Sequence, residues 1–340
     1  MRLLHVILLS AVVTFTLLGA REYEFTSEQE LQKIYSSTIS NHFYKQELHY
    51  FSTTDTLKIA YKTFPAKNAK ATIVIASGRA ESMLKYKELI YDLNQNSYSV
   101  YILDHRGQGY SDRLLDDSQL GHVDDFFDYV LDLKYFVKRI VPKDKKMILF
   151  AHSMGGTVAS LYAQTYKRDF DALVLHSPMH QPTLLSNYLV GFVCYLAQKY
   201  KTNPYRYVFT KRSYDDTKHE FEGNRFTHSK IRFELAKSSY EKEPRTKVGG
   251  PSTHWLAQAC IWSKASVQNA DKIEIPILLL QAGDEMVVNN KAQEEFCENA
   301  AQKCQLKRFE GAYHEMFVEK DSIRKEVLSE MLDFISKISR

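Results

Sequence analysis

Short, wholly apolar runs alternate along the chain with longer stretches whose apolar residues recur at helical spacing. The runs predict strands at residues 71–78, 98–107, 146–153, 171–178 and 275–284, and a more polar segment predicts a last strand at residues 305–314. The stretches between them predict helices at residues 84–97, 126–141, 155–166, 292–301 and 322–338. Apolar strands that alternate with helices form a mostly parallel sheet covered on both faces. The pattern therefore predicts an α/β fold.

A different pattern precedes the first parallel strand. Residues 47–64 contain two runs of alternating apolar and polar residues around Thr53-Thr54-Asp55, which predict an antiparallel hairpin. The polar stretch before them, residues 27–42, predicts a helix. The hairpin adds antiparallel strands to an otherwise parallel sheet.

The regular alternation of strands and helices lapses between residues 179 and 265. An apolar segment, residues 184–200, is followed there by a polar and aromatic stretch. We interpret the region as an insertion between two strands rather than a separate domain. The expected organisation is a core in two parts, residues 21–178 and 266–340, interrupted by this insertion.

The first twenty residues have a composition of their own. Met1-Arg2 is followed by an apolar run to Leu18 that closes on Gly19-Ala20, which is the pattern of a signal peptide. Leu18 is a poor residue for the cleavage site, so an uncleaved membrane anchor is the alternative. Both alternatives predict export, with a periplasmic or inner-membrane-associated catalytic domain outside the cytoplasm.

Export makes the four cysteines candidates for disulfides. Cys297 and Cys304 lie seven residues apart and can form a local pair, which leaves Cys194 and Cys260 as the second. Four cysteines allow three connectivities, and four buried free thiols are the other alternative.

Charge and composition exclude some classes of function. The 45 basic and 41 acidic residues give a net charge of +4, which is too mild to indicate nucleic-acid binding but compatible with a membrane surface. No spacing of Cys and His is typical of a metal site, so the sequence implies no metal and no cofactor. Oligomeric state cannot be read from it.

One serine stands at the junction of a predicted strand and a predicted helix. In the stretch "AHSMGG", Ala151 and Gly155 lie two residues to either side of Ser153. A sharp strand-to-helix turn that exposes a nucleophilic serine requires small residues at those places. A serine that only caps the helix is the alternative.

A nucleophilic serine needs a base and an acid that orients the base, and in this fold they follow it in the order acid, then histidine. Asp284 follows the predicted strand 275–284, with Glu285 beside it as the backup acid. His314 follows the last predicted strand and precedes the last helix. We therefore predict Ser153 as nucleophile, Asp284 as acid and His314 as base.

Two backbone N–H groups are expected to stabilise the oxyanion, those of Met154 and Arg79. Gly78 lets the loop after strand 71–78 turn toward the site, so we expect it beside the substrate. The apolar face of the insertion adds Tyr188 and Phe192 as candidate substrate contacts. The same face either lines an acyl tunnel or packs on the core.

The motifs "ASGRAES", "DHRGQGYSDR", "AHSMGG", "LHSPM", "QAGDEMVV" and "GAYHE" occur in an order that resembles the bacterial lysophospholipases of the α/β-hydrolase superfamily, close to the monoacylglycerol lipases. The resemblance runs from about Tyr50 to the C-terminus. It implies an α/β-hydrolase fold, the same Ser153, Asp284 and His314, and a mainly helical cap formed by residues 179–265.

The expected function is hydrolysis of the carboxylic ester of a lysophospholipid through an acyl-enzyme, at a membrane surface. Lysophospholipid is preferred to monoacylglycerol mainly because of the resemblance. A small-ester carboxylesterase or thioesterase is the alternative enzyme, and a lipid-binding protein on a hydrolase scaffold is the alternative without catalysis. The motif "DHRGQGYSDR" lacks the Lys of a phosphate loop and precedes the serine, so we interpret it as a structural turn.

Overall fold

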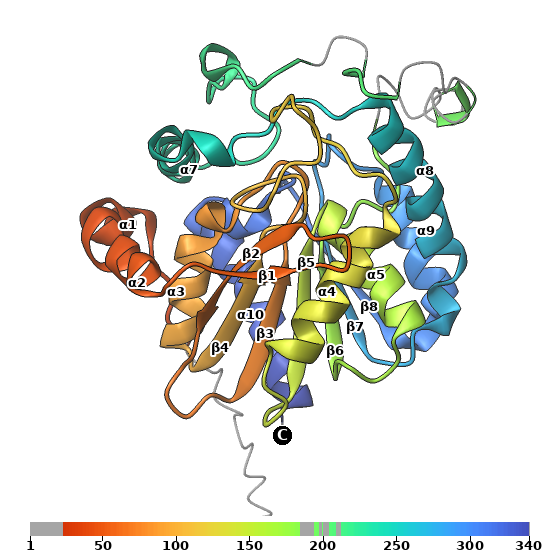
Figure 1. Cartoon of the computed structure of the whole chain (residues 1–340). Coiled ribbons are helices and arrows are strands. Elements are labelled where there is room, and N and C mark those ends of the chain that lie inside the picture. Colours follow the sequence, from red (N-terminus) through yellow and green to blue (C-terminus); the bar gives the residue numbers. More distant parts are fainter. Residues whose placement is uncertain (1–22, 184–193, 197–198, 200–203, 209–211, 340) are drawn as a thin grey trace, which may run out of the picture.

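A computed structural model describes residues 23–183, 194–196, 199, 204–208 and 212–339 of the protein. An eight-stranded sheet forms its centre, in the order β1-β2-β4-β3-β5-β6-β7-β8 (Figure 1). The strands are β1 (His49–Ser52), β2 (Lys58–Phe64), β3 (Ala71–Ala76), β4 (Tyr98–Leu103), β5 (Met147–His152), β6 (Ala172–His176), β7 (Ile277–Ala282) and β8 (Cys304–Phe309).

The sheet is mostly parallel, as the apolar runs predict. β1 and β2 form the expected antiparallel hairpin, β2 also runs antiparallel to β4, and every later pair is parallel. Strands β3 to β7 are buried along their whole length, which explains why they lack alternating polar residues.

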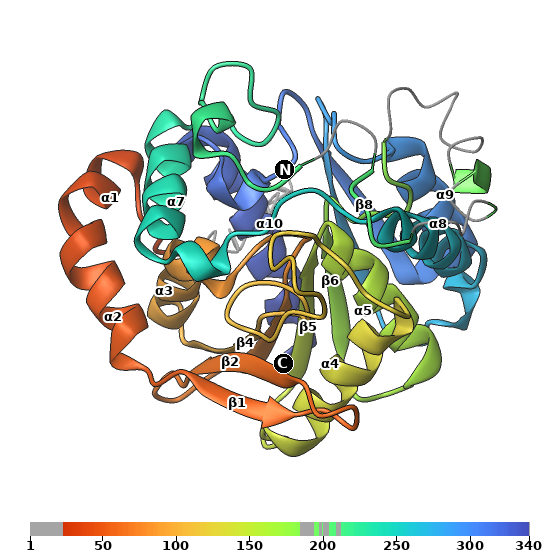
Figure 2. The same cartoon turned by 45° about the horizontal axis from the view of Figure 1, so that its top comes forward.

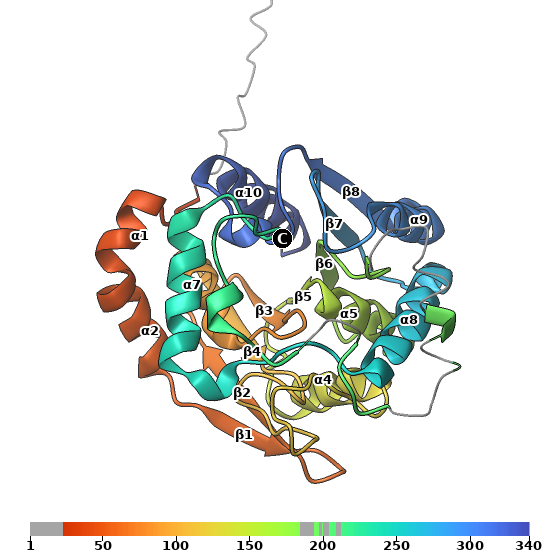
Figure 3. The same ribbon diagram turned by 90° about the horizontal axis from the view of Figure 1, so that it is seen from above.

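Helices cover both faces of the sheet (Figure 3). The α-helices of the described residues are α1 (Glu28–Ile34), α2 (Ser40–Lys45), α3 (Lys87–Gln95), α4 (Phe127–Arg139), α5 (Met154–Thr165), α7 (Lys230–Lys242), α8 (Thr253–Gln268), α9 (Asn290–Ala300) and α10 (Asp321–Ile338), of which α7 belongs to the insertion. Side chains of α4, α5, α8 and α9 join one apolar cluster on the sheet, and those of α2, α3 and α10 join the other. The two clusters are the core, and the fold is that of an α/β-hydrolase.

The insertion lies between β6 and β7, above the carboxyl ends of the strands (Figures 1 and 2). Its described part contains α7 and two short 3₁₀ turns, Asp216–Lys218 and Pro244–Thr246, joined by loops. The expected boundary at residue 265 falls inside α8. This helix packs against α5 and α9.

Both cysteine pairs form disulfides. Cys194 is bonded to Cys260 of α8, and Cys297 of α9 is bonded to Cys304 of β8. The first bond ties the insertion to α8. Residues 1–20, the predicted signal peptide or anchor, lie outside the described residues, and within the described part no helix has the length and apolar character needed to cross a bilayer.

Candidate active site

Ser153 lies between β5 and α5 in a conformation that a non-glycine residue rarely adopts, with φ 52° and ψ −118°. Its N–H donates to the His176 carbonyl at 3.1 Å, and its own carbonyl accepts the amides of Gly156 and Met179. A side chain on Gly155 would come within 2.2 Å of the Ala76 carbonyl oxygen. The small residue therefore lets helix and strand approach, and the surrounding hydrogen bonds hold the strained turn.

The structure brings His314 to this serine. His314 Nε2 lies 3.0 Å from Ser153 Oγ, and its Nδ1 lies 2.8 Å from Glu285 Oε2. His314 is 2 % exposed. The arrangement is a nucleophile, a base within hydrogen-bond distance, and a carboxylate that orients the base.

The carboxylate that contacts His314 is Glu285, so the prediction that Asp284 occupies this position is wrong. The Asp284 amide donates to the Ala312 carbonyl at 3.0 Å, and its side chain is exposed. Glu285, the residue named as the backup, follows with its carboxylate turned inward, where Oε1 accepts the amides of Val287 and Val288. The two loops after β7 and β8 thus decide which of two adjacent acids is used.

Electrostatics of the pair favour a charged carboxylate. Burial by itself lowers the pKa of His314, but the Glu285 carboxylate outweighs it and the net pKa is raised above its usual value. Burial likewise acts to raise the pKa of Glu285, and His314 together with the two amides brings it below its usual value. The imidazole is held in one orientation and is a better proton acceptor than a free histidine.

The two amides expected to hold the oxyanion belong to the residue after Ser153 and to the loop after β3. Met154 is the first residue of α5, where helical N–H groups have no partner within the helix. Arg79 lies in the loop after β3, and neither amide donates to another group in the part of the chain that the structure describes. Both donors are free to bind an oxygen atom.

A buried carboxylate that the sequence analysis missed holds this loop. Glu81 Oε2 accepts the Gly78 amide at 2.6 Å and the Tyr86 hydroxyl at 2.5 Å, and Oε1 accepts from Lys85 at 3.1 Å. Its Oε1 also lies 3.1 Å from His152 Nδ1. Glu81 therefore links the loop to β5, the strand that Ser153 directly follows. The spacing of Glu81 and Lys85, four residues apart, was the available signal.

Burial and neighbouring charges act in opposite directions on the pKa values of Glu81 and Lys85. Burial acts to raise the pKa of Glu81, yet Lys85 and His152 bring it well below its usual value. Lys85 Nζ also donates to Glu315 at 2.6 Å, and although burial lowers the pKa of Lys85, the two carboxylates raise it overall. Glu315 directly follows His314, so the network spans both loops of the site.

The motif "DHRGQGYSDR" is the structural turn that we predicted. The buried Asp104 carboxylate accepts the amides of Met83 and Tyr110, and burial raises its pKa to about 6. Arg106 forms ion pairs with Asp132 and two further aspartates. Both charged side chains are occupied within the fold.

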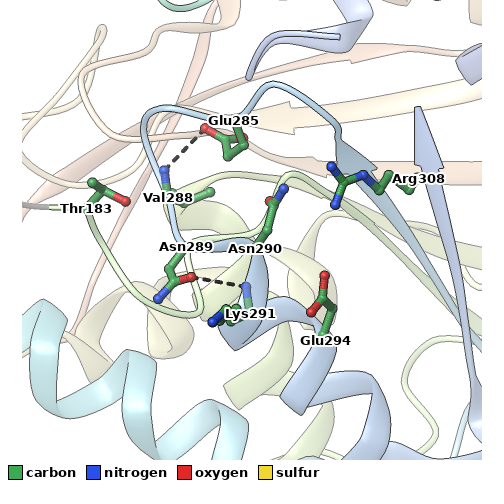
Figure 4. A pocket seen from close by; sticks show the side chains of 8 residues that line it. All are labelled: Thr183, Glu285, Val288, Asn289, Asn290, Lys291, Glu294 and Arg308. Atoms are coloured by element: carbon green, nitrogen blue, oxygen red, sulfur yellow. Dashed lines mark hydrogen bonds between the residues drawn. The ribbon is translucent and has the colours of Figure 1, made fainter. Parts of the chain in front are cut away.

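The structure describes only part of the insertion that was expected to contact the substrate. Tyr188 and Phe192 lie outside the described residues, whereas Phe226 of the insertion packs 6.5 Å from the His314 ring between ring centres. A polar hollow beside Glu285 is lined by Asn289, Lys291, Glu294 and Arg308 among others (Figure 4). Neither Ser153 nor His314 lines it, so it is not the acyl site.

Comparisons with known proteins show which families the chain resembles. A family model described as serine aminopeptidase S33 matches residues 67–321. Lysophospholipase L2 of Escherichia coli K12 is 34% identical over 300 residues, covering 84% of this chain and 86% of that protein. Monoglyceride lipase of Mus musculus is 26% identical over 276 residues, covering 80% and 84%.

Solved structures show the same fold. A soluble variant of monoglyceride lipase from Saccharomyces cerevisiae, bound to a substrate analog, superposes with a TM-score of 0.68 at 20% identity and covers 86% of this chain and 96% of that one. A carboxyl esterase from Bacillus coagulans in complex with glycerol gives 0.67 at 17% identity, covering 87% and 99%.

Proposed function

Because the chain belongs to the serine aminopeptidase S33 family of α/β-hydrolases, among the lysophospholipases and monoacylglycerol lipases, we propose that it hydrolyses the carboxylic ester of lysophospholipids with Ser153 as nucleophile. One observation carries the proposal: the continuous hydrogen-bonded series from Ser153 through His314 to Glu285, placed at a strained strand-to-helix turn. The protein is a serine ester hydrolase.

The reaction follows from the positions of these groups. Ser153 Oγ attacks the ester carbonyl carbon as its proton passes to His314 Nε2, and the carbonyl oxygen becomes an oxyanion between the amides of Met154 and Arg79. The intermediate collapses, the C–O bond to glycerol breaks, and the leaving glycerophosphodiester takes the proton from His314. Glu285 stabilises the imidazolium that exists between these two steps.

Water then completes the cycle by the same route. His314 removes a proton from a water molecule that attacks the acyl-enzyme, and the second tetrahedral intermediate breaks to return that proton to Ser153 Oγ. The products are a fatty acid and a glycerophosphodiester. An alcohol in place of water gives acyl transfer by the same chemistry.

Lysophospholipid is the proposed substrate because the relatives with 33–34% identity over most of both chains bear that name. Monoacylglycerol is the second candidate, supported by the more distant monoglyceride lipases. The two share an acyl chain on glycerol and differ in the phosphate. A small-ester carboxylesterase would gain nothing in kcat/KM from a long acyl chain, which separates it from both.

The site of action is part of the same proposal. We place the enzyme outside the cytoplasm, periplasmic or held at the inner membrane by residues 1–20, where it works on lipid at the membrane surface. The two disulfides support an oxidising compartment, because such bonds are rare where thiols are kept reduced.

Covalent labelling tests the proposal. The purified exported protein is treated with a fluorophosphonate probe and weighed intact by mass spectrometry, beside Ser153→Ala and beside a sample with excess lysophospholipid. We expect one adduct, absent from the variant and suppressed by the lipid. The same mass reveals whether residues 1–20 remain. A folded protein that takes no adduct contradicts the proposal and favours a lipid-binding role.

A further inference from the structure

Arg79 offers a second group to the active site besides its backbone amide. It follows Gly78 in the loop after β3, and this loop touches the first turn of α5. A side chain on Gly155 would approach the carbonyl oxygens of Ala76 and Ser77 within 2.2 and 2.7 Å. A side chain on Gly78, the residue before Arg79, would come within 3.1 Å of His152 Nδ1, so the loop brings Arg79 close to the turn that carries Ser153.

The Arg79 side chain extends from this loop toward the insertion. Nη1 donates to the Gly249 carbonyl at 3.0 Å, and the guanidinium carbon lies 5.6 Å from the centre of the Trp255 ring. A side chain on Gly121 would also come within 3.5 Å of Nη1. These contacts fix the guanidinium between the oxyanion loop, which is the loop after β3 that contains Gly78 and Arg79, and the place where the insertion rejoins the core at α8.

This guanidinium has no carboxylate partner within 4.0 Å in the described part of the chain. The buried arginines Arg106 and Arg232, in contrast, each bind carboxylates directly. Glu81, the carboxylate that acts on Arg79 through space, is already bound by Lys85. Burial lowers the pKa of Arg79, but an arginine stays charged at neutral pH.

An unpaired cation that is partly removed from water favours an anionic ligand, since buried charges are normally paired. A guanidinium donates two parallel N–H groups to the oxygens of a phosphate, a geometry that no lysine reproduces. Of the surface cations in the insertion, Lys199, Arg206 and Arg212 are exposed, where water screens their charge.

The Arg79 side chain is about as long as the part of the substrate that joins the ester carbonyl to the phosphate. About six covalent bonds, roughly 9 Å along the chain at about 1.5 Å per bond, separate the ester carbonyl carbon of a 1-acyl lysophospholipid from its phosphorus. About six bonds also separate the amide nitrogen of an arginine from its guanidinium carbon. A substrate whose carbonyl oxygen is held by the Arg79 amide thus carries its phosphate within range of the same side chain.

We propose that the Arg79 guanidinium binds the phosphodiester of a lysophospholipid while the amide of the same residue holds the ester oxyanion. The assignment rests on the proposed function and adds the group that distinguishes a lysophospholipid from a monoacylglycerol. It involves the phosphate alone, so lysophospholipids with choline, ethanolamine or glycerol head groups are expected to depend on Arg79 to a similar degree.

A ratio of rates tests the assignment. The value of kcat/KM is measured for a lysophosphatidylglycerol and for a monoacylglycerol with the same acyl chain, in wild type and in Arg79→Met, which keeps an unbranched apolar stem and the backbone amide but removes the guanidinium. We expect the ratio of lysophospholipid to monoacylglycerol to fall about 10–100-fold, the effect of losing a charged hydrogen bond. The ratio is independent of the fraction of enzyme that is folded.

Arg245→Met is the matched control. Arg245 also stacks on a ring, that of Tyr110 at 5.0 Å, and donates to a backbone carbonyl, but it is exposed and belongs to another loop. We expect it to leave the ratio unchanged. If Arg79→Met loses all activity, Arg79→Lys takes its place. A ratio of kcat/KM for lysophospholipid to kcat/KM for monoacylglycerol that is at least 3-fold lower in Arg79→Lys than in wild type supports the assignment.

The outcomes separate this assignment from the proposed function. An unchanged ratio in Arg79→Met or Arg79→Lys, in an enzyme that still labels at Ser153 and cleaves both lipids, overturns the role of Arg79 alone. A wild-type enzyme that cleaves monoacylglycerol but no lysophospholipid overturns the phosphate site and the lysophospholipid substrate together. Absence of labelling at Ser153 overturns the serine mechanism itself.

Discussion

Two buried histidine–carboxylate pairs lie side by side in this protein and have different partners. His314 Nδ1 is 2.8 Å from Glu285, and His152 Nδ1 is 3.1 Å from Glu81. The two histidine rings are 4.9 Å apart between centres. Sequence position separates them as well, because His152 precedes the serine on β5 whereas His314 follows the last strand.

The partners of each carboxylate indicate its role. Glu285 binds His314 and two backbone amides, and no Lys or Arg pairs with it in the described part of the chain. Its charge therefore acts on the imidazole. Glu81 divides its charge among Lys85, a tyrosine hydroxyl, a loop amide and His152. We infer that Glu285 orients a base and that Glu81 fixes the position of the oxyanion loop.

The largest effect is expected from Glu285→Gln. The amide keeps the size of the side chain but removes the negative charge that stabilises the imidazolium, so we expect kcat to fall about 10³–10⁴-fold. Asp284→Asn is the matched control at the adjacent acid, and because that side chain is exposed its kcat is expected to stay within about 2-fold of wild type. Steady-state hydrolysis of a lysophospholipid measures both, and the reverse order of effects contradicts the geometry.

Glu81→Gln is expected to have the next largest effect. Loss of the carboxylate weakens the hold on the Gly78 amide and leaves Lys85 with Glu315 alone, so we expect kcat about 10–100-fold lower and the free energy of unfolding about 3 kcal/mol lower. Urea denaturation and titration of active sites with the fluorophosphonate separate the two effects.

Glu88→Gln supplies the control for Glu81. Glu88 is also a buried carboxylate, bound by Arg232 and Arg324 on the side of the sheet that α3 and α10 cover. We expect a comparable loss of stability with kcat per active site unchanged. Equal losses of kcat in the two variants would mean that Glu81 acts only through stability.

A smaller effect is expected in the dependence of kcat/KM on pH. His314 must be neutral to accept the serine proton, so kcat/KM is expected to fall as the pH is lowered through the raised pKa of His314. Glu285→Gln removes the main raising influence, so its residual activity should persist to lower pH than that of wild type. An acid limb that does not move identifies a different titrating group.

The free energy of unfolding also depends on the His314–Glu285 pair, but its dependence on pH has the opposite sign to that of kcat/KM. A histidine whose folded pKa is raised stabilises the fold below its unfolded pKa, and this contribution is lost as the pH rises through the folded pKa. Protonation therefore favours folding and opposes catalysis.

Much of this molecule could be predicted from sequence, because apolar runs and strand ends are local features. The fully buried strands, the hairpin, and the positions of Ser153 and His314 after β5 and β8 all depend on local pattern. The choice between Asp284 and Glu285 does not. It depends on a hydrogen bond from the Asp284 amide to Ala312, in a loop that the sequence does not connect to it.

The role of Glu81 was hidden for the same reason. Three of its partners are near in sequence, but His152 lies 71 residues away, and Lys85 reaches Glu315 across 230 residues. Long-range partners, rather than weak local signals, account for what was missed.

The smallest effect is expected from Tyr86→Phe, which removes one donor from Glu81 and leaves the others in place. The hydroxyl is buried and lies 2.5 Å from Oε2, so its loss should lower the free energy of unfolding by about 1–2 kcal/mol. Because the Gly78 amide still binds Glu81, kcat should stay within about 3-fold of wild type. Urea denaturation and lysophospholipid hydrolysis measure the two quantities. A fall in kcat as large as that of Glu81→Gln would show that the hydroxyl itself fixes the carboxylate against the loop, and Tyr86 would then join Glu81 as a positioning residue.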